Sequence, residues 1–178
     1  MKNKKNVDLL TAIFLIVISI ILLLFPILKI TNLKWSLFGI MILYSVSNLI
    51  QFILTRKAKD YEGIAISICS LTIGLVGLMF KLYQTPIKVA ITLLTWVALM
   101  SLIKLKKADY YHDQNSSLWK ISMATLVIFV LIGILTSFNL YHAEDIQTII
   151  LGFFFFIHGL LELMEPVAIH FLGVKKWK

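Results

Sequence analysis

Cysteine is almost absent from this chain, which has one, Cys69, in 178 residues. A single cysteine excludes a disulfide within the chain, and no second thiol is present to complete a cysteine-based metal site. Cys69 stands in the middle of a long apolar segment, where a free cysteine behaves as a small hydrophobic residue. We interpret it as a packing residue.

Sequence motifs of the common enzyme classes are absent too. There is no HExxH metal motif, no phosphate-binding loop and no set of Ser, His and Asp arranged for nucleophilic catalysis. The pair His158 and Glu162, four residues apart, offers only two metal ligands. We therefore predict a protein that is not an enzyme and has no catalytic residues, no metal site and no cofactor.

Long polar segments are lacking as well. Hydrophobic residues make up 60% of the chain and the mean hydropathy is +0.92, whereas soluble chains average about 45–50% apolar residues. A membrane-spanning helix needs roughly 20 mainly apolar residues. The longest connection, 104–117, is too short to fold alone, so we predict one integral-membrane domain over residues 1–178. The six expected transmembrane helices are 8–28, 35–55, 63–82, 86–103, 118–138 and 146–168.

The net charge is +8, yet the basic residues do not form a surface for nucleic acid. Most of the 17 Lys and Arg residues lie at the two ends of the chain and in the connections after the second and fourth segments. Short cationic loops stay on the cytoplasmic side of a membrane. We therefore expect a multi-pass protein of the cytoplasmic membrane with both termini inside, in contact with the lipid bilayer and not with nucleic acid.

The six segments pair into three hairpins, closed by short connections at 29–34, 83–85 and 139–145. Their second helices align weakly at offsets near 53 and 58, as IMILYSVSNLIQFI (40–53), TLLTWVALMSLIKL (92–105) and LGFFFFIHGLLELM (151–164). Hairpins of one orientation imply parallel repeats about an axis along the membrane normal. The predicted fold is therefore an all-α membrane protein of three two-helix hairpins with pseudo-threefold symmetry.

Glycines near FGIMILYSVSNLIQFI and GFFFFIHGLLEL, and a proline near the outer turn in LLLFPILKITNLKWSLFG, complete this pattern. In these features the chain resembles the HdeD-like family of small membrane proteins built from two-helix repeats. The second hairpin departs from the family pattern, because TLLTWVALMSLI contains no glycine. The resemblance implies a bacterial inner-membrane protein without established catalytic residues, linked to the envelope or to acid stress.

The third segment carries a stripe of small residues at spacings of four, three, four and three. Helices in lipid associate by close backbone approach, which small residues at such spacing allow. We interpret the stripe as a packing face; the alternative is a pore wall or ligand groove. Its members are Gly63, Ser67, Ser70, Gly74 and Gly77.

Aromatic residues with polar tips lie mostly where the predicted spans end. Trp35, Tyr83 and Tyr141 are expected as anchors at the outer membrane surface, and Trp119, Tyr110, Tyr111 and Trp177 at the inner one. Trp96, near the middle of the fourth span, is expected to be buried in the bundle.

Ionisable residues within the last span are the main candidates for function. At 1.5 Å per residue, His158 lies about 18 Å into that helix, near mid-membrane, and Glu162 lies one turn further on the same face. Glu165 and Pro166 are interpreted as the inner end of the helix. Such residues are costly at membrane depth, and a functional role is the default hypothesis for them.

The repeat alignment suggests structural partners for these and other polar residues. It places Gln51, Lys104 and Glu162 at one depth, which predicts a polar ring with an ion pair between Lys104 and Glu162. Asn48 is expected to form an interhelical hydrogen bond, for instance to Ser101 of the equivalent helix.

Two interpretations of His158 stay open: a neutral imidazole satisfied by a serine or carbonyl, or a proton-responsive switch, since ordinary histidine titrates near pH 6.5. The sequence thus predicts a non-enzymatic membrane protein. The alternative is a small transporter or proton-linked channel that uses His158 and Glu162. A homo-oligomer or a membrane-protein partner is left open.

Overall fold

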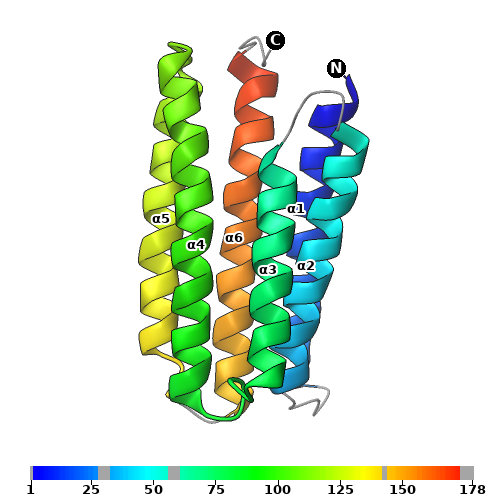
Figure 1. Ribbon diagram of the computed structural model, residues 1–178, viewed down its shortest axis with the longest axis vertical. Coiled ribbons are helices and arrows are strands. Elements are labelled where there is room, and N and C mark those ends of the chain that lie inside the picture. The colour runs from blue at the N-terminus through cyan, green and yellow to red at the C-terminus, as the bar shows by residue number, and fades with distance from the viewer. Residues whose placement is uncertain (1, 28–32, 56–60, 142–143, 173–178) are drawn as a thin grey trace.

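The computed structural model describes residues 2–27, 33–55, 61–141 and 144–172. This part of the chain forms six helices and contains no strand, as predicted. The helices, shown in Figure 1, are α1 (Lys2–Leu24), α2 (Leu33–Thr55), α3 (Tyr61–Met79), α4 (Pro86–Asp113), α5 (Leu118–Phe138) and α6 (Glu144–Leu172).

Five of these helices are long and apolar enough to cross a membrane. Their apolar stretches are Leu37–Leu54, Tyr61–Met79, Pro86–Asp113, Leu118–Phe138 and Ile146–Phe171. In α1 the apolar stretch of the described side chains is Leu9–Leu24, and the helix ends at Leu24 and not at position 28. The chain therefore has the build of a multi-pass α-helical membrane protein.

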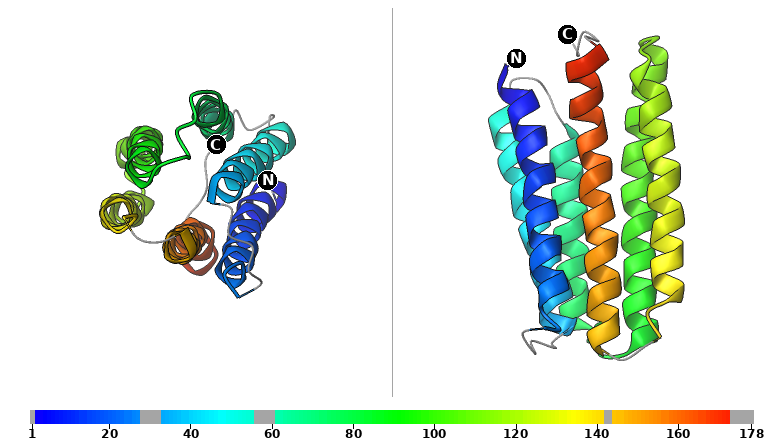
Figure 2. Two further views of the ribbon diagram at one scale, coloured as in Figure 1. Left: turned by 90° about the horizontal axis from the view of Figure 1, so that it is seen from below. Right: turned by 180° about the vertical axis from the view of Figure 1, so that it is seen from behind.

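The helices run alternately up and down and form a closed ring (Figure 2). Each helix packs on its neighbours in the chain, and α1 closes the ring by packing on α6. The most extensive contacts are those of α1 with α6, α2 with α3 and α4 with α5. Both ends of the chain lie at the same end of the bundle, here called the termini end (Figure 1).

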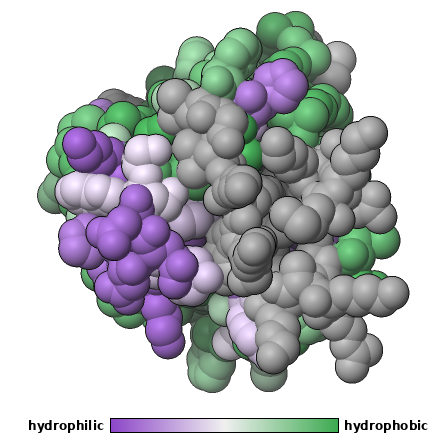
Figure 3. Space-filling model, turned by 90° about the horizontal axis from the view of Figure 1, so that it is seen from above, coloured by the Kyte–Doolittle hydropathy of each residue, from purple (hydrophilic) through white to green (hydrophobic). Residues whose placement is uncertain are grey.

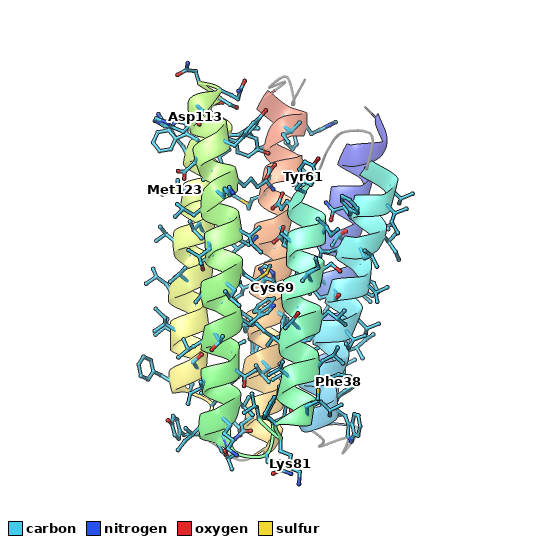
Figure 4. The ribbon with its side chains drawn as sticks, viewed as in Figure 1. Phe38, Tyr61, Cys69, Lys81, Asp113 and Met123 are labelled. Atoms are coloured by element: carbon cyan, nitrogen blue, oxygen red, sulfur yellow. The ribbon has the colours of Figure 1, made fainter. Side chains whose placement is uncertain are left out.

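Labelled side chains mark the levels of the bundle in Figure 4: Tyr61 and Asp113 lie toward the termini end, Cys69 at mid-height and Lys81 at the opposite end, here called the Lys81 end. Viewed onto the termini end, hydrophilic side chains gather on one side, over the end of α4 and the start of α5 (Figure 3). Asp109, His112 and Asp113 are exposed there.

Two helices extend beyond their predicted ends at the termini end. Helix α4 continues past Ile103 to Asp113, so most of the predicted connection 104–117 is helical. Helix α6 continues through Pro166 to Leu172, so Glu165 and Pro166 are not its inner end. Proline lacks the N–H that would bond to the carbonyl four residues earlier, here that of Glu162. Because the helix continues past the proline despite this missing bond, the interpretation of Pro166 as a helix stop is wrong.

The small-residue stripe of α3 is a packing face, as predicted. All five of its members are buried. A Cβ on Gly63 would lie 3.0 Å from the Asn48 carbonyl oxygen, and one on Gly74 would lie 3.2 Å from the Met41 Cβ, both on α2. Between them, the Ser45 hydroxyl donates to the Ser67 carbonyl at 2.8 Å. The stripe brings α2 and α3 close enough for backbone groups to touch.

Glycines on α6 allow the corresponding approach of α1. A Cβ on Gly152 would lie 2.8 Å from side-chain atoms of Leu23, and one on Gly159 would lie 2.7 Å from Ile16 Cγ1. The ring closes tightly at this seam because small residues again allow backbones to approach in a lipid environment.

The core differs between the two ends of the bundle. Toward the Lys81 end its largest fully buried side chains are apolar and include Leu37, Met41, Leu93, Leu151 and Phe155. Uncharged polar residues are buried there too, namely Ser19, Thr92, Thr136, Ser137, Gln147 and Thr148. No charged side chain of the described residues is buried in that half. The charged side chains of the interior lie on the other side of mid-height, toward the termini. We call the two parts the uncharged half and the charged half.

Two of the tyrosines predicted as membrane anchors are instead buried. The Tyr83 hydroxyl, 4% exposed as a residue, lies 3.2 and 3.3 Å from the carbonyl oxygens of Ile73 and Gly74, to which it donates. Burial raises the pKa of Tyr83 to about 12. Tyr111 is also buried and donates to Glu165. Trp35 and Tyr141 are exposed, in keeping with anchors, whereas Trp177 lies outside the described residues.

Candidate functional site

His158 lies on α6 at mid-height of the bundle and is 1% exposed. Aromatic rings from four helices surround its imidazole, with ring centroids 4.7–6.3 Å away. They belong to Tyr44 of α2, Trp96 of α4, Phe129 of α5 and Phe154 of α6 itself. Trp96 is fully buried, as predicted, and its indole N–H donates to the Ser70 hydroxyl at 3.0 Å. We name these four rings the aromatic enclosure.

The two ring nitrogens of His158 have different surroundings. Nε2 is 3.2 Å from the Tyr44 hydroxyl and 3.7 Å from Glu162 Oε1, one helical turn nearer to the termini end. Nδ1 is buried and has no hydrogen-bond partner. Buried polar side-chain atoms are nearly always paired, so an unpaired nitrogen at this depth requires an explanation. The hydroxyl that pairs with the imidazole is thus that of Tyr44, at Nε2, and not a serine or a backbone carbonyl.

Beyond Glu162, toward the termini, five ionisable side chains form what we call the charge cluster. They are Glu62 of α3, Lys104 and Lys107 of α4, and Glu162 and Glu165 of α6. Lys104 pairs with Glu162. Lys107 lies between two carboxylates, with Nζ 2.9 Å from Glu62 Oε2 and 2.7 Å from Glu165 Oε2. At this level, ion pairs between side chains connect α3, α4 and α6.

The charge cluster is mostly shielded from the surroundings, since its side chains are 14–23% exposed. With every group ionised, three carboxylates and two ammonium groups leave a formal charge of 2 − 3 = −1. Lys104 Nζ also lies 5.6 Å from the Phe129 ring centroid, so the cluster touches the aromatic enclosure directly. Among the described residues, therefore, the ammonium groups of the cluster do not balance all three carboxylates, and a buried charge without an equal counter-charge is costly.

Two small polar cavities flank the charge cluster. One, of about 30 Å³, lies between α1, α2, α3, α4 and α6, and Thr11 and Gln51 contribute to its polar lining. The other, of about 20 Å³, lies between α3, α4, α5 and α6, with Ser122 and Thr125 in its lining. Each is large enough for a water molecule, for which roughly 10–15 Å³ suffices. Together they reach all six helices, so the cluster occupies the centre of the ring.

The structure brings together only part of the predicted polar ring. The ion pair between Lys104 and Glu162 is present. Gln51 lines the larger cavity with Glu162 and accepts a hydrogen bond from the Thr11 hydroxyl at 3.3 Å.

The predicted hydrogen bond between Asn48 and Ser101 is wrong. The Asn48 amide donates to the Tyr44 carbonyl, and the Ser101 hydroxyl to the Val97 carbonyl, each within its own helix. Asn48 also lines the larger cavity, so it belongs to the charged half of the core without joining α2 to α4.

Sequence reasoning missed Glu62, Lys107 and Tyr111, and the spacing of α4 contained a signal for the last two. Lys104, Lys107 and Tyr111 are three and four residues apart, so they share one helix face. The offset of 58 residues that pairs Lys104 with Glu162 also pairs Lys107 with Glu165. The predicted end of the span at Ile103 placed these residues in a loop, where no face could be assigned to them.

The arrangement defines a class: a six-helix membrane bundle with a charge cluster in the interior of one half and no buried charge among the described residues of the other. No protein-family model matches the chain, and no curated protein or solved structure matches it either. The relation to HdeD-like proteins therefore stays a prediction. Within the described residues, no group of three or more His, Cys, Asp or Glu side chains is placed to hold a metal ion.

Proposed function

We propose that this protein is a small transporter or channel whose path runs through the centre of the helix ring. The observation that carries this proposal is the charge cluster, with a cavity on each side, enclosed by six helices. Ionisable residues at membrane depth face a bundle interior and mark the pathways of ions and substrates in membrane proteins. A packing role alone does not need five charged groups in which, among the described residues, the carboxylates outnumber the ammonium groups.

The difference between the two halves of the core supports the same function. The charge cluster and its two cavities lie between the termini end and His158, and no charged side chain of the described residues is buried beyond His158. In alternating access, the central site is reached from one side of the membrane at a time. A bundle with charged groups and cavities on one side of mid-height only fits one such state. The closed half then opens only when the helices move.

We also infer that the termini end faces the cytoplasm of a bacterial inner membrane, with α1 as a sixth span. The concentration of Lys residues in the connections of that end supports this orientation. The extensive contacts recur at every second interface around the ring, as a threefold repeat would give, but they join α2 to α3, α4 to α5 and α6 to α1 and not the two helices of a predicted hairpin. Fusing a cytoplasmic reporter and a periplasmic reporter to each terminus tests the orientation; activity of the periplasmic reporter at either terminus would refute it.

The transport proposal is tested with purified protein in liposomes. A potassium gradient with valinomycin sets the membrane potential, while trapped dyes report internal pH and internal Na⁺. We expect the parent protein to move protons or Na⁺ faster than empty liposomes do. We expect Glu162→Gln to lose most of this flux, because it removes the charge between the cavities and His158.

Asp109→Asn is the matched control variant, because Asp109 is an exposed carboxylate on the same end of α4, outside the charge cluster. It should leave the flux unchanged. Absence of both fluxes in the parent protein refutes the proposal. Equal flux in the parent and in Glu162→Gln refutes the path.

The role in the envelope or in acid stress implied by the HdeD-like resemblance is a second proposal, for a protein without enzyme activity. A buried histidine next to an ion pair gives it a specific observation, since protonation would disturb both. Survival at low pH of cells with and without the gene tests it, and equal survival would contradict it.

A further inference from the structure

We propose that His158 is a proton relay, so that the transported ion is the proton and not a hydrated metal ion. This inference rests on the proposed function and names the ion for the same path. It starts from the unpaired Nδ1 nitrogen of a side chain that is 99% buried, at the boundary between the charged and the uncharged half of the core.

The enclosure of His158 selects for the proton by size. Aromatic rings from α2, α4, α5 and α6 surround the imidazole, and the two cavities beside the charge cluster are lined by Glu162 but not by His158. A hydrated ion has no room to pass between these rings. A proton needs none, because it enters on one nitrogen of the imidazole and leaves from the other.

The groups around His158 supply a donor on one side only. Glu162 from α6 and the Tyr44 hydroxyl from α2 face Nε2. Lys104 from α4 pairs with Glu162 and lies over Phe129, the residue that α5 contributes to the enclosure. Hence Nε2 can exchange a proton with Glu162, which lines both cavities of the charged half. Nδ1 is the nitrogen that remains to exchange a proton with the uncharged half.

The relay consists of two balanced steps. A proton on the Glu162 carboxyl moves to Nε2: the O–H bond breaks, an N–H bond forms, and the products are a carboxylate and an imidazolium. The aromatic enclosure stabilises this cation through the faces of its rings. When the uncharged half opens to water, the Nδ1–H bond breaks and the proton passes to a water molecule, which leaves a neutral imidazole protonated on Nε2. The cycle closes when the ring turns, which brings the free nitrogen to Glu162 and the protonated nitrogen to the uncharged half.

The enclosure also makes the relay conditional on helix movement. In the closed structure Nδ1 has no acceptor, so the proton stays on the imidazole ring until water enters the uncharged half. An open water wire is thereby avoided, and proton flow is tied to the opening of the bundle.

The test uses the proteoliposomes and dyes described above. His158→Gln keeps an amide of similar reach but cannot carry a proton through a ring. We expect its proton flux to fall roughly 100-fold, within the range that a positioned acid–base group contributes. His112→Gln, which alters an exposed histidine at the end of α4, should keep the parental flux.

Chemical rescue separates a relay from a structural role. His158→Ala leaves a space for a small ring, and added imidazole should restore proton flux. Added 1-methylimidazole fills the same space but has only one nitrogen that can exchange a proton, so it should not restore flux.

Each outcome decides a different statement. Na⁺ flux without proton flux in the parent protein refutes the relay and leaves transport standing. Proton flux that survives His158→Gln, or equal rescue by the two ring compounds, also refutes the relay alone. No flux of either ion in the parent refutes both proposals.

Discussion

Removing either partner of the Lys104–Glu162 ion pair should destabilise the protein, but by unequal amounts. Breaking a buried ion pair by removing one partner costs roughly 3–5 kcal/mol, because the other charge is left uncompensated. The side chains of this pair are 14% and 23% exposed and lie beside cavities, so we expect values at or below the lower end of that range.

The formal charge of the charge cluster decides which variant is worse. It is −1 in the parent; Glu162→Gln brings it to 2 − 2 = 0, and Lys104→Gln brings it to 1 − 3 = −2. In Lys104→Gln, Glu162 faces Glu165 three residues away on the same helix face, about 5–6 Å between Cβ atoms. At an effective dielectric constant of about 20, two unit charges at that separation repel by about 3 kcal/mol.

We therefore expect Lys104→Gln to cost about 3 kcal/mol of unfolding free energy and Glu162→Gln about 1 kcal/mol, since partial screening reduces the full repulsion. The double variant should lose less than the sum of the two, by about 1–2 kcal/mol. Reversible unfolding in mixed detergent micelles, followed by circular dichroism, measures all three differences. Lys106→Gln is the control, because Lys106 is exposed on α4 and outside the cluster.

Equal costs for the two single variants, or a larger cost for Glu162→Gln, would show that the cluster carries no surplus negative charge. Strict additivity in the double variant would show that the two side chains do not interact. Either result refutes the reasoning.

Three further variants test how tightly side chains pack in the uncharged half and at mid-height of the bundle. Gly77→Ala should lower the unfolding temperature, because the new Cβ would lie 2.3 Å from the Tyr83 ring, whereas Gly39→Ala, with no atom within 4 Å of its Cβ, should not. Tyr83→Phe should cost about 1 kcal/mol by removing its hydrogen bonds to α3. Since the raised pKa of about 12 keeps this hydroxyl protonated, that cost should not change across the neutral pH range, and a change would contradict the burial of the group. Trp96→Phe should cost about 1–2 kcal/mol through the lost bond to Ser70 and a small cavity; an unchanged unfolding curve in detergent would contradict the tight packing around it.

The sequence was sufficient for the helices and for one ion pair. Apolar runs of membrane length predicted six helices, and small residues at spacings of three and four predicted the packing face of α3. The pair of Lys104 with Glu162 followed from a repeat offset that brought two opposite charges to one level.

The rest of the charge cluster could not be predicted, because the sequence indicates the depth of a side chain in the membrane but not whether it points into the bundle or toward lipid. Lys107, Tyr111 and Glu165 stand near span ends, where a polar residue serves equally well at the lipid headgroups or inside the bundle. The same ambiguity affected Tyr83. Only the packing of α3, α4 and α6 against one another decides that these side chains point inward.

Pro166 gives α6 a mechanical role that its length alone would not suggest. The helix lacks one backbone bond at the Glu162 carbonyl, so it is weakest against bending between its long lower part and its last turns. Glu165, next to the proline, is held by Lys107 and Tyr111 of α4. The contacts of Glu165 with α4 thus also hold the two parts of α6 in line on either side of the missing backbone bond. Neutralising Glu165 or Lys107 would allow the end of α6 to bend away from α4.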